Sequence, residues 1–335
     1  MKLRFQKDAI VNGINIVMKA VPSKTTMSIL ECILIDASTG EIKLTGNDME
    51  LGIETKVEGE ILEHGKIALD AKLFSEITRR LSSENASVTI ESDDKFTTTI
   101  SCENSVFNIQ GRDGEEFAYL PYIEKDKYIC LSQFTLKEVI QQTIFSISPN
   151  DSNKMMAGEL FEVNENQLKV VSLDGHRISI RKVRLKDHYD DTKVIVPGKT
   201  LSEISKILGG DNEKEVLIYF SANHILFEFD STVVVSRLIE GEYFRINQML
   251  SSDYETKVSV NKKEFLNCIE RATILIREND KKPLIINIGD NSMEMKLNSS
   301  FGSMNADLMI HKTGKDIMIG FNPKFLIDAL RVIDD

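Results

Sequence analysis

The sequence of 335 residues lacks the patterns that mark membrane and secreted proteins. No window approaches the ~20 consecutive apolar residues that a membrane-spanning helix needs. The opening stretch MKLRFQKDAIVNGINIVMKAV has no continuous apolar run of the kind found in secretion signals. The four cysteines are scattered without a CxxC pair, which argues against a zinc site or a disulfide framework and favours buried thiols. We therefore expect a cytoplasmic protein.

Signatures of catalysis and nucleotide binding are also missing. The sequence contains no P-loop, no GxGxxG and no GxSxG, and its five histidines are isolated from one another. We expect no cofactor and no metal. The formal net charge of −11 argues against a general nucleic-acid binder, which is usually basic, unless the positive charge is gathered on one surface.

One short pattern occurs three times and organises the chain. At 194–208, VIVPGKTLSEISKIL gives β-branched residues, a Pro-Gly corner and an amphipathic helix, and the same layout recurs at 67–81 and 319–333. In each copy a basic, an acidic and a second basic residue fall at i, i+4 and i+7 on one helical face. The first lysines of the copies, at 72, 199 and 324, are 127 and 125 residues apart. This nearly constant offset predicts three repeats.

Each repeat begins with an earlier helix, near 6–20, 133–147 and 261–275, which is followed by strand segments. The order of helix, strands, helix and strands predicts α+β domains with antiparallel meanders, at 1–125, 126–252 and 253–335. The first two repeats run about 44 residues past their second helix, whereas the third stops two residues after Ile333. We therefore expect the third domain to be incomplete at its C-terminus, without its last strands.

The segment Asp174-Gly175-His176-Arg177 allows two interpretations. His176 would be a general base oriented by Asp174 in a hydrolase or transferase. Alternatively, Asp-Gly forms a tight turn and the next two residues begin a strand, which the absence of a nearby nucleophile or second histidine favours.

The polar rows of the helices also allow two interpretations. Each row is either a solvated face with i,i+4 ion pairs or, if the helices of all repeats face one axis, part of a positively charged lining. Such a lining would bind phosphates without reading sequence. The cations are Lys72, Arg79, Arg80, Lys199, Lys206, Lys324 and Arg331.

Several motifs together resemble the bacterial DNA polymerase III beta subunit, the sliding clamp family. These are the opening MKLRF, VVSLDGHRISI at 170–180, KVIVPGKTLSEISKIL at 193–208, SRLIEGEY at 236–243 and IGFNPKFLIDAL at 319–330. The resemblance covers the whole chain and implies the DNA clamp fold: three repeated domains per chain and two chains closed head-to-tail into a ring, with helices lining the hole.

The resemblance also implies a function without catalysis. A clamp encircles double-stranded DNA and tethers the catalytic subunit of DNA polymerase III, which gives processivity. The clamp loader, repair polymerases, mismatch-repair proteins and ligase use the same peptide-binding pocket, and we expect a nucleoid-associated homodimer. In such a ring, Glu76, Glu203 and Asp328 would moderate the positive lining, so that DNA slides. A repeat-built scaffold with no DNA role is the remaining alternative from the residues alone.

Site residues carried over from the family fall into three groups. The pocket positions are Met156, Leu173, Gly175, His176, Arg177, Ile178, Phe244, Gln248, Met249, Asn322 and Phe325; the family usually has a proline and an arginine where this chain has YFRINQM. The DNA-binding positions are Lys24, Lys72, Arg80, Asn150, Lys154, Lys199 and Lys206, with Lys154 and Met155 replacing aromatic contacts. At the ring interface, Phe107 would face Ile274 and Leu275.

Overall fold

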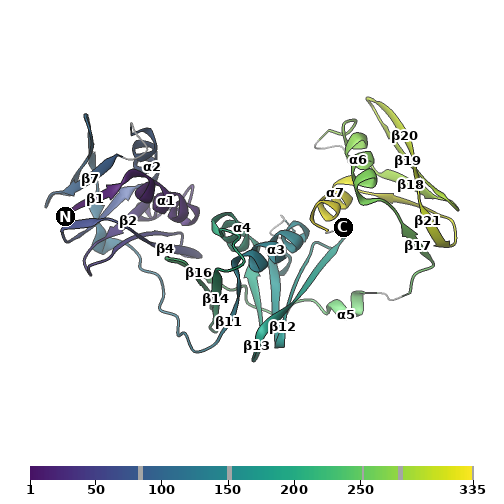
Figure 1. The fold of residues 1–335 in the computed structure, drawn as a ribbon, viewed down its shortest axis with the longest axis horizontal. Helices are drawn as coiled ribbons and strands as arrows, with labels where there is room; N and C mark the ends of the chain where they lie inside the picture. Colours follow the sequence, from purple (N-terminus) through teal and green to yellow (C-terminus); the bar gives the residue numbers. More distant parts are fainter. Residues whose placement is uncertain (82–85, 149–152, 251–252, 278–281, 334–335) are drawn as a thin grey trace.

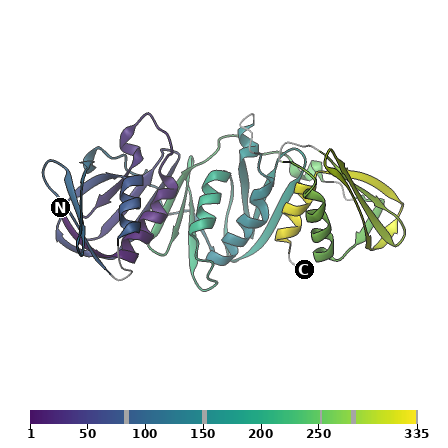
Figure 2. The same ribbon diagram turned by 90° about the horizontal axis from the view of Figure 1, so that it is seen from above.

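The structure is a computed structural model that describes residues 1–81, 86–148, 153–250, 253–277 and 282–333. Three domains follow one another along an arc, with the helices on its concave side and the strands on its convex side (Figure 1). Seen from above, the helices lie side by side along the arc (Figure 2). The same face of each repeat therefore points toward one centre. None of the described helices is long and apolar enough to cross a membrane.

The first domain consists of two helices and two antiparallel sheets, one of which continues into the second domain. Its helices are α1 (Lys7–Val17) and α2 (Ala71–Arg80). Its strands are β1 (Lys2–Gln6), β2 (Cys32–Asp36), β3 (Ile42–Asn47), β4 (Leu51–Val57), β5 (Glu60–Glu63), β6 (Lys66–Asp70), β7 (Ser87–Ser92), β8 (Thr97–Cys102), β9 (Ser105–Gln110) and β10 (Arg112–Asp113). One sheet has the order β5-β1-β7-β8-β9, so β9 lies at its edge.

The second domain repeats this order with longer strands. Its helices are α3 (Gln133–Thr143) and α4 (Gly198–Ile207), and its strands are β11 (Tyr128–Ser132), β12 (Gly158–Leu173), β13 (Ile178–Pro197), β14 (Glu215–Phe220), β15 (His224–Phe229) and β16 (Thr232–Arg237). By position in the repeat, β12 takes the place of β2 and β3, and β13 that of β4, β5 and β6. The two strands form one long antiparallel hairpin whose register shifts near Glu165.

The third domain follows a short helix, α5 (Ile246–Met249). Its helices are α6 (Lys262–Thr273) and α7 (Pro323–Val332), and its strands are β17 (Thr256–Ser259), β18 (Leu284–Ile288), β19 (Ser292–Ser299), β20 (Gly302–Met309), β21 (His311–Gly314) and β22 (Ile317–Phe321). The larger sheet has the order β20-β19-β18-β22, while β17 pairs with β21. The predicted α+β repeat of helix, strands and helix is confirmed in all three domains.

The first two domains share a sheet and a core. β4 pairs with β16 in antiparallel register, with Thr55 opposite Thr232, so that nine strands run without a break across the boundary. One apolar cluster extends through both domains, whereas the third domain has a separate cluster around Ile269 and Met295. Across the described residues, no sheet links the second domain to the third.

The helices begin and end where local chemistry directs. Asp70 caps α2, Ser132 caps α3 and Asn261 caps α6, each accepting a backbone N–H in the first turn. The first helix of each repeat is shorter than the sequence predicts, because α1 and α3 tighten into short 3₁₀ turns at Met18–Ala20 and Ile144–Ser146. The apolar faces of the amphipathic helices are buried, including Phe74 in α2 and Ile204 in α4.

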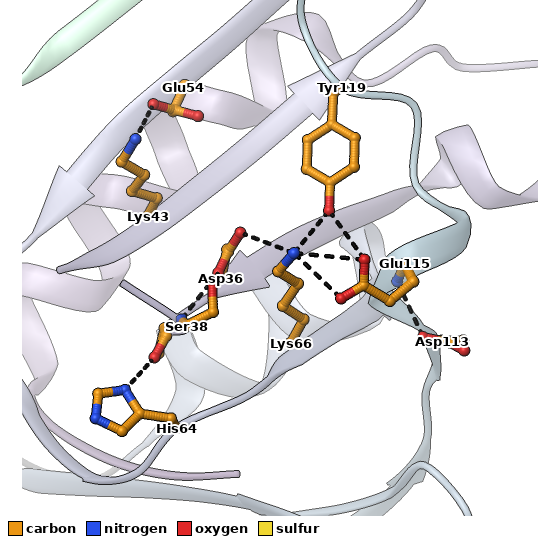
Figure 3. Close-up of polar contacts among 10 residues, drawn as sticks. Asp36, Ser38, Lys43, Glu54, His64, Lys66, Asp113, Glu115 and Tyr119 are labelled. Atoms are coloured by element: carbon orange, nitrogen blue, oxygen red, sulfur yellow. Dashed lines mark hydrogen bonds and ion pairs between the residues drawn. The ribbon is translucent and has the colours of Figure 1, made fainter. Parts of the chain in front are cut away.

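Lys66 on β6 fixes the chain where it leaves the first domain (Figure 3). Its ammonium donates to the Tyr119 hydroxyl at 2.8 Å and lies 3.2 Å from Glu115 and 3.7 Å from Asp36. The hydrogen bonds to Tyr119 and Glu115 raise the pKa of Lys66 above its ordinary value, so the side chain stays charged. This cluster attaches the segment after β10 to the first domain before the chain crosses to the second.

Candidate functional site

The turn between β12 and β13 carries the first group of predicted pocket residues. One oxygen of the Asp174 carboxylate accepts the backbone N–H groups of His176 and Arg177, at 3.1 and 3.2 Å, and Gly175 has a φ of 86°. Glycine takes this left-handed conformation with little strain, which explains its place at the tip. The other oxygen of Asp174 accepts from the Arg177 side chain. Asp174 therefore holds the turn and the arginine, and this geometry gives no support to a catalytic Asp174/His176 pair.

An apolar cluster behind the turn forms the floor of the candidate pocket. Leu173 is buried in it, and Met156, Ile178 and Phe244 pack against it while half-buried. The other buried members are Leu160, Val171, Ile195, Tyr243 and Ile246. These five are missing from the sequence prediction. Strand alternation marks Leu160, Val171 and Ile195 as core residues without saying which face of the domain they line, and Tyr243 and Ile246 lie after the last strand, where no periodic pattern marks them.

Tyr243 closes the floor beside Phe244, with the two rings edge to face and their centroids 5.6 Å apart. The Tyr243 hydroxyl donates to the Val171 carbonyl at 3.3 Å. Burial, and after it the charge of Glu159, raises the pKa of Tyr243, so the hydroxyl stays protonated. A hollow of about 520 Å³ opens beside Tyr243 and Phe244. It is lined by Leu160 and Ile195 of the cluster and by the charged residues Lys193, Glu240, Glu242 and Arg245. The cluster therefore has one open side with a mixed apolar and charged lining, beside the turn at 174–178.

Arg177 is less exposed than a rim residue would be. Its Nε donates to Asp174 at 2.9 Å, one terminal nitrogen donates to Asp328 at 2.8 Å, and the other donates to the Phe145 carbonyl. The guanidinium lies 4.3 Å from the Phe325 ring centroid and 5.3 Å from that of Phe145. Arg177, one of the predicted pocket residues, is therefore part of a wall between the second and third domains and is not an exposed rim residue.

Helix α7 brings two further predicted residues to the turn. The His176 and Phe325 rings lie 5.8 Å apart. Asn322 caps α7 by accepting the N–H of Lys324 at 3.0 Å, so its side chain fixes the helix start. Within the described chain, Gln248 and Met249 do not join the apolar cluster; both are exposed on α5, Met249 by 54%. The structure thus gathers nine of the eleven predicted pocket residues around the turn, the cluster and α7.

The predicted DNA-binding residues lie on helices and loops of the concave side or next to it. Lys72 and Arg80 are exposed on α2, and Lys199 and Lys206 are exposed on α4. Lys24 lies in the loop after α1, and Lys154 begins the short turn before β12, Lys154–Ala157. Asn150 lies outside the described residues.

Carboxylates neutralise part of this positive charge, in one case as the sequence predicts and in another case not. Lys206 pairs with Glu203 on its own helix at 2.7 Å, and Lys199 pairs with Asp48 of the first domain. Asp328, expected to moderate the lining, instead pairs with Arg177 at the domain boundary. Which partner Asp328 meets depends on how α7 is rotated against the second domain, and the spacing of residues along the helix does not determine that rotation.

The predicted ring-interface residues lie at opposite ends of the arc. Phe107 is 38% exposed on β9, the edge of its sheet. Ile274 is 80% exposed just after α6, while Leu275 packs on the core of the third domain and touches the position where β20 begins. Both ends therefore present an unpaired strand edge with apolar residues on or next to it.

Comparison with known proteins gives one answer along the whole chain. Residues 1–121, 130–244 and 247–335 match the N-terminal, central and C-terminal domains of the DNA polymerase III beta subunit. A beta sliding clamp of Staphylococcus aureus is 33% identical over 345 residues, covering all of this chain and 91% of the relative.

Solved structures agree with the sequence matches. The sliding clamp of Bacillus subtilis is 33% identical, with a TM-score of 0.95 over all of this chain and 90% of that one. A candidate beta subunit of Eubacterium rectale is 65% identical, with a TM-score of 0.96 over the same shares. With its threefold repeat and its helices along one concave face, the chain belongs to the DNA polymerase III beta subunit family, the non-catalytic sliding clamps of that polymerase.

Proposed function

We propose that two copies of this chain close into a ring around double-stranded DNA, tether the replicative polymerase and receive other proteins in one peptide pocket. The observation that carries the proposal is the placement of six helices, two per domain, along the concave side of one arc (Figure 1). A concave face of helices with exposed lysines suits a phosphate backbone, and it carries no arrangement for reading base edges.

The charges of the concave face fit a sliding contact. Lys72 and Arg80 are exposed on α2, while Lys199 and Lys206 are each paired with a carboxylate. The rest of the chain is acidic, with a formal net charge of −11. DNA is therefore attracted weakly inside the arc and repelled elsewhere, and the attraction falls as salt rises.

Strand pairing at the boundary between the first and second domains supports a way for the ring to close. β4 of the first domain pairs with β16 of the second. By position in the repeat, β20 corresponds to β4 and β9 corresponds to β16, and both are edge strands of their own sheets. A head-to-tail contact of β20 with β9 of a second copy would continue the pairing rule and bring Leu275 toward Phe107.

The pocket around Arg177 supports docking of several proteins. The apolar floor and its open hollow suit apolar anchors of an extended peptide, and His176 is exposed at the rim. We propose that the catalytic subunit of DNA polymerase III, the clamp loader, repair polymerases, mismatch-repair proteins and ligase share this pocket. We also propose domain boundaries at 1–125, 126–252 and 253–335, and a cytoplasmic, nucleoid-associated location.

Retention on DNA tests the ring. After loading by the clamp loader of the same bacterium, the protein should stay on closed circles and leave linearised DNA rapidly. Phe107→Asp places a charge on the edge of β9 and should abolish retention and shift the mass in solution from dimer to monomer. Tyr122→Asp, a change at an exposed aromatic of the linker, should do neither. Equal loss from circles and linear DNA by the wild type would refute the ring.

Binding of the purified polymerase catalytic subunit tests the pocket. His176→Ala should weaken that binding strongly and leave ring formation intact, because the residue lies far from both strand edges of the ring contact. Wild-type protein that does not bind the polymerase, or a His176→Ala variant that binds equally well, would contradict the pocket and leave the ring proposal standing.

A further inference from the structure

One guanidinium connects the second domain to the third. Each of the three nitrogens of Arg177 donates a hydrogen bond, to Asp174 and the Phe145 carbonyl in its own domain and to Asp328 on α7. Rings from both domains, Phe145 and Phe325, lie against the guanidinium. Because the donor directions of the planar guanidinium are fixed, Arg177 constrains both the distance and the orientation of α7 relative to the second domain.

Asp328 lies one helical turn beyond Phe325 on α7, so both side chains leave the same face of the helix. Phe325 packs on His176 and Arg177, both of which belong to the proposed peptide pocket. A helix that rotated or slid away from Arg177 would carry Phe325 with it and open the wall of the pocket.

The ion pair is partly shielded from water. The side chains of Arg177 and Asp328 are 17% and 21% exposed, whereas those of Arg331 and Glu270, paired at 2.8 Å within the third domain, are 61% and 38% exposed. A shielded, charge-assisted hydrogen bond is stronger than a surface pair, which contributes little. A second hydrogen bond joins described residues of the second and third domains. It runs from the Gln142 side chain to the Val332 carbonyl and is long, at 3.3 Å.

We propose that Asp328 is a positioning residue for partner binding: it holds Arg177 and α7 together so that His176, Arg177 and Phe325 form one wall. The proposal rests on the peptide pocket proposed above. It adds that affinity for the polymerase depends on a carboxylate that the peptide does not touch, and that peptide binding and the joint between the domains are coupled.

Substitutions of Asp328 test this role with the whole chain. Asp328→Asn keeps the size of the side chain and removes the charge-assisted bond, so affinity for the polymerase catalytic subunit, measured by surface plasmon resonance, should fall about tenfold. Asp328→Glu restores the charge and should recover part of the affinity. Glu270→Gln, which removes a carboxylate that also binds α7 but within the third domain, should change affinity less than twofold.

Two further readouts separate positioning from loss of fold. The far-ultraviolet circular dichroism of Asp328→Asn and Glu270→Gln should both match that of the wild type, which shows that neither variant has lost its fold. Hydrogen exchange should speed up at the backbone N–H groups of residues 174–178 in Asp328→Asn only, because Arg177 loses one of its anchors. Equal exchange there in both variants would overturn the proposal.

The outcomes distinguish this inference from the function on which it rests. If His176→Ala loses binding while Asp328→Asn binds like the wild type, the positioning role is wrong and the pocket stands. If the wild type itself does not bind, the pocket is wrong. If Asp328→Glu binds as weakly as Asp328→Asn, the carboxylate does not act through Arg177 and the inference is overturned.

Discussion

The buried carboxyl of Glu159 should make the stability of the second domain depend strongly on pH. The side chain lies on β12 and is fully buried. Its Oε2 is 3.0 Å from the Thr143 hydroxyl, and its Oε1 has no hydrogen-bond partner in the described chain. Thr143 has a single hydroxyl hydrogen, and the Val139 carbonyl lies closer to it, at 2.8 Å. The arrangement therefore suits a protonated Glu159 that donates to Thr143.

The magnitude follows from the pKa of this group. Burial raises the pKa of Glu159 from 4.5 to about 8. Between these values the folded protein binds a proton that the unfolded chain has released, so the free energy of unfolding falls as pH rises. The slope is about 1.4 kcal/mol per pH unit, and the sum over the window is about 5 kcal/mol. This stability is fully present below pH 4.5 and is lost as pH rises through 8.

Glu159→Gln isolates the effect. Glutamine has nearly the same shape, can donate to Thr143 and stays neutral at every pH. The variant should match the wild type at pH 5 and exceed it at pH 9. The melting temperature of the first two domains, which share one core, should then be raised by more than about 5 °C in scanning calorimetry. Glu162→Gln, on the same strand but half-buried and paired with Lys169 at 2.9 Å, is the control and should show no such gain. Parallel pH profiles for Glu159→Gln and the wild type from pH 5 to 9 would refute the reasoning.

Three other substitutions test the pocket and the concave face. Gly175→Ala should cost about 1 kcal/mol in the free energy of unfolding, because φ is 86° while no atom lies within 4 Å of the new methyl group. Gly175→Ala should also weaken polymerase binding. The control is Gly40→Ala, where φ is 85° and the new methyl group also meets no atom within 4 Å. It should lose a similar free energy of unfolding in a denaturant titration and bind the polymerase normally. Tyr243→Phe removes the hydrogen bond to Val171 and should cost about 1 kcal/mol in chemical denaturation, yet change polymerase affinity less than twofold because the apolar floor remains. Lys206→Glu should shorten residence on circular DNA in a salt-dependent way, and Lys182→Glu, exposed on β13, should not; equal effects of the two would remove α4 from the DNA contact.

The threefold repeat was the feature of the fold that could best be predicted from the sequence. The recurring row of basic, acidic and basic residues located α2, α4 and α7 to within a few residues, because that row repeats at a nearly fixed offset. Asp48 and Asp174 are also one repeat apart. Each lies in a turn and forms an ion pair at a domain boundary, Asp48 with Lys199 and Asp174 with Arg177. Sequence could align these two residues but could not show what they bind.

Contacts between distant segments limited the prediction of the site. The pair of Arg177 and Asp328 joins residues 151 positions apart, and the polar row of α7 gave no sign that its acidic member turns away from its basic neighbours. Gln248 and Met249 were expected in the pocket from the resemblance, but the four-residue helix α5 buries Ile246 and leaves them exposed. A short helix has little pattern from which its rotation can be read.

The sheet shared by the first two domains has a mechanical consequence. Bending that boundary would stretch the ladder of five residue pairs between β4 and β16 together, since they act in parallel. The boundary between the second and third domains, over the described residues, carries load through the side chain of Arg177 and a few helix contacts. A torque on the arc therefore meets one rigid joint and one compliant joint. Deformation should concentrate at the compliant joint, where the proposed pocket lies. A peptide bound in the pocket would therefore stiffen the boundary between the second and third domains.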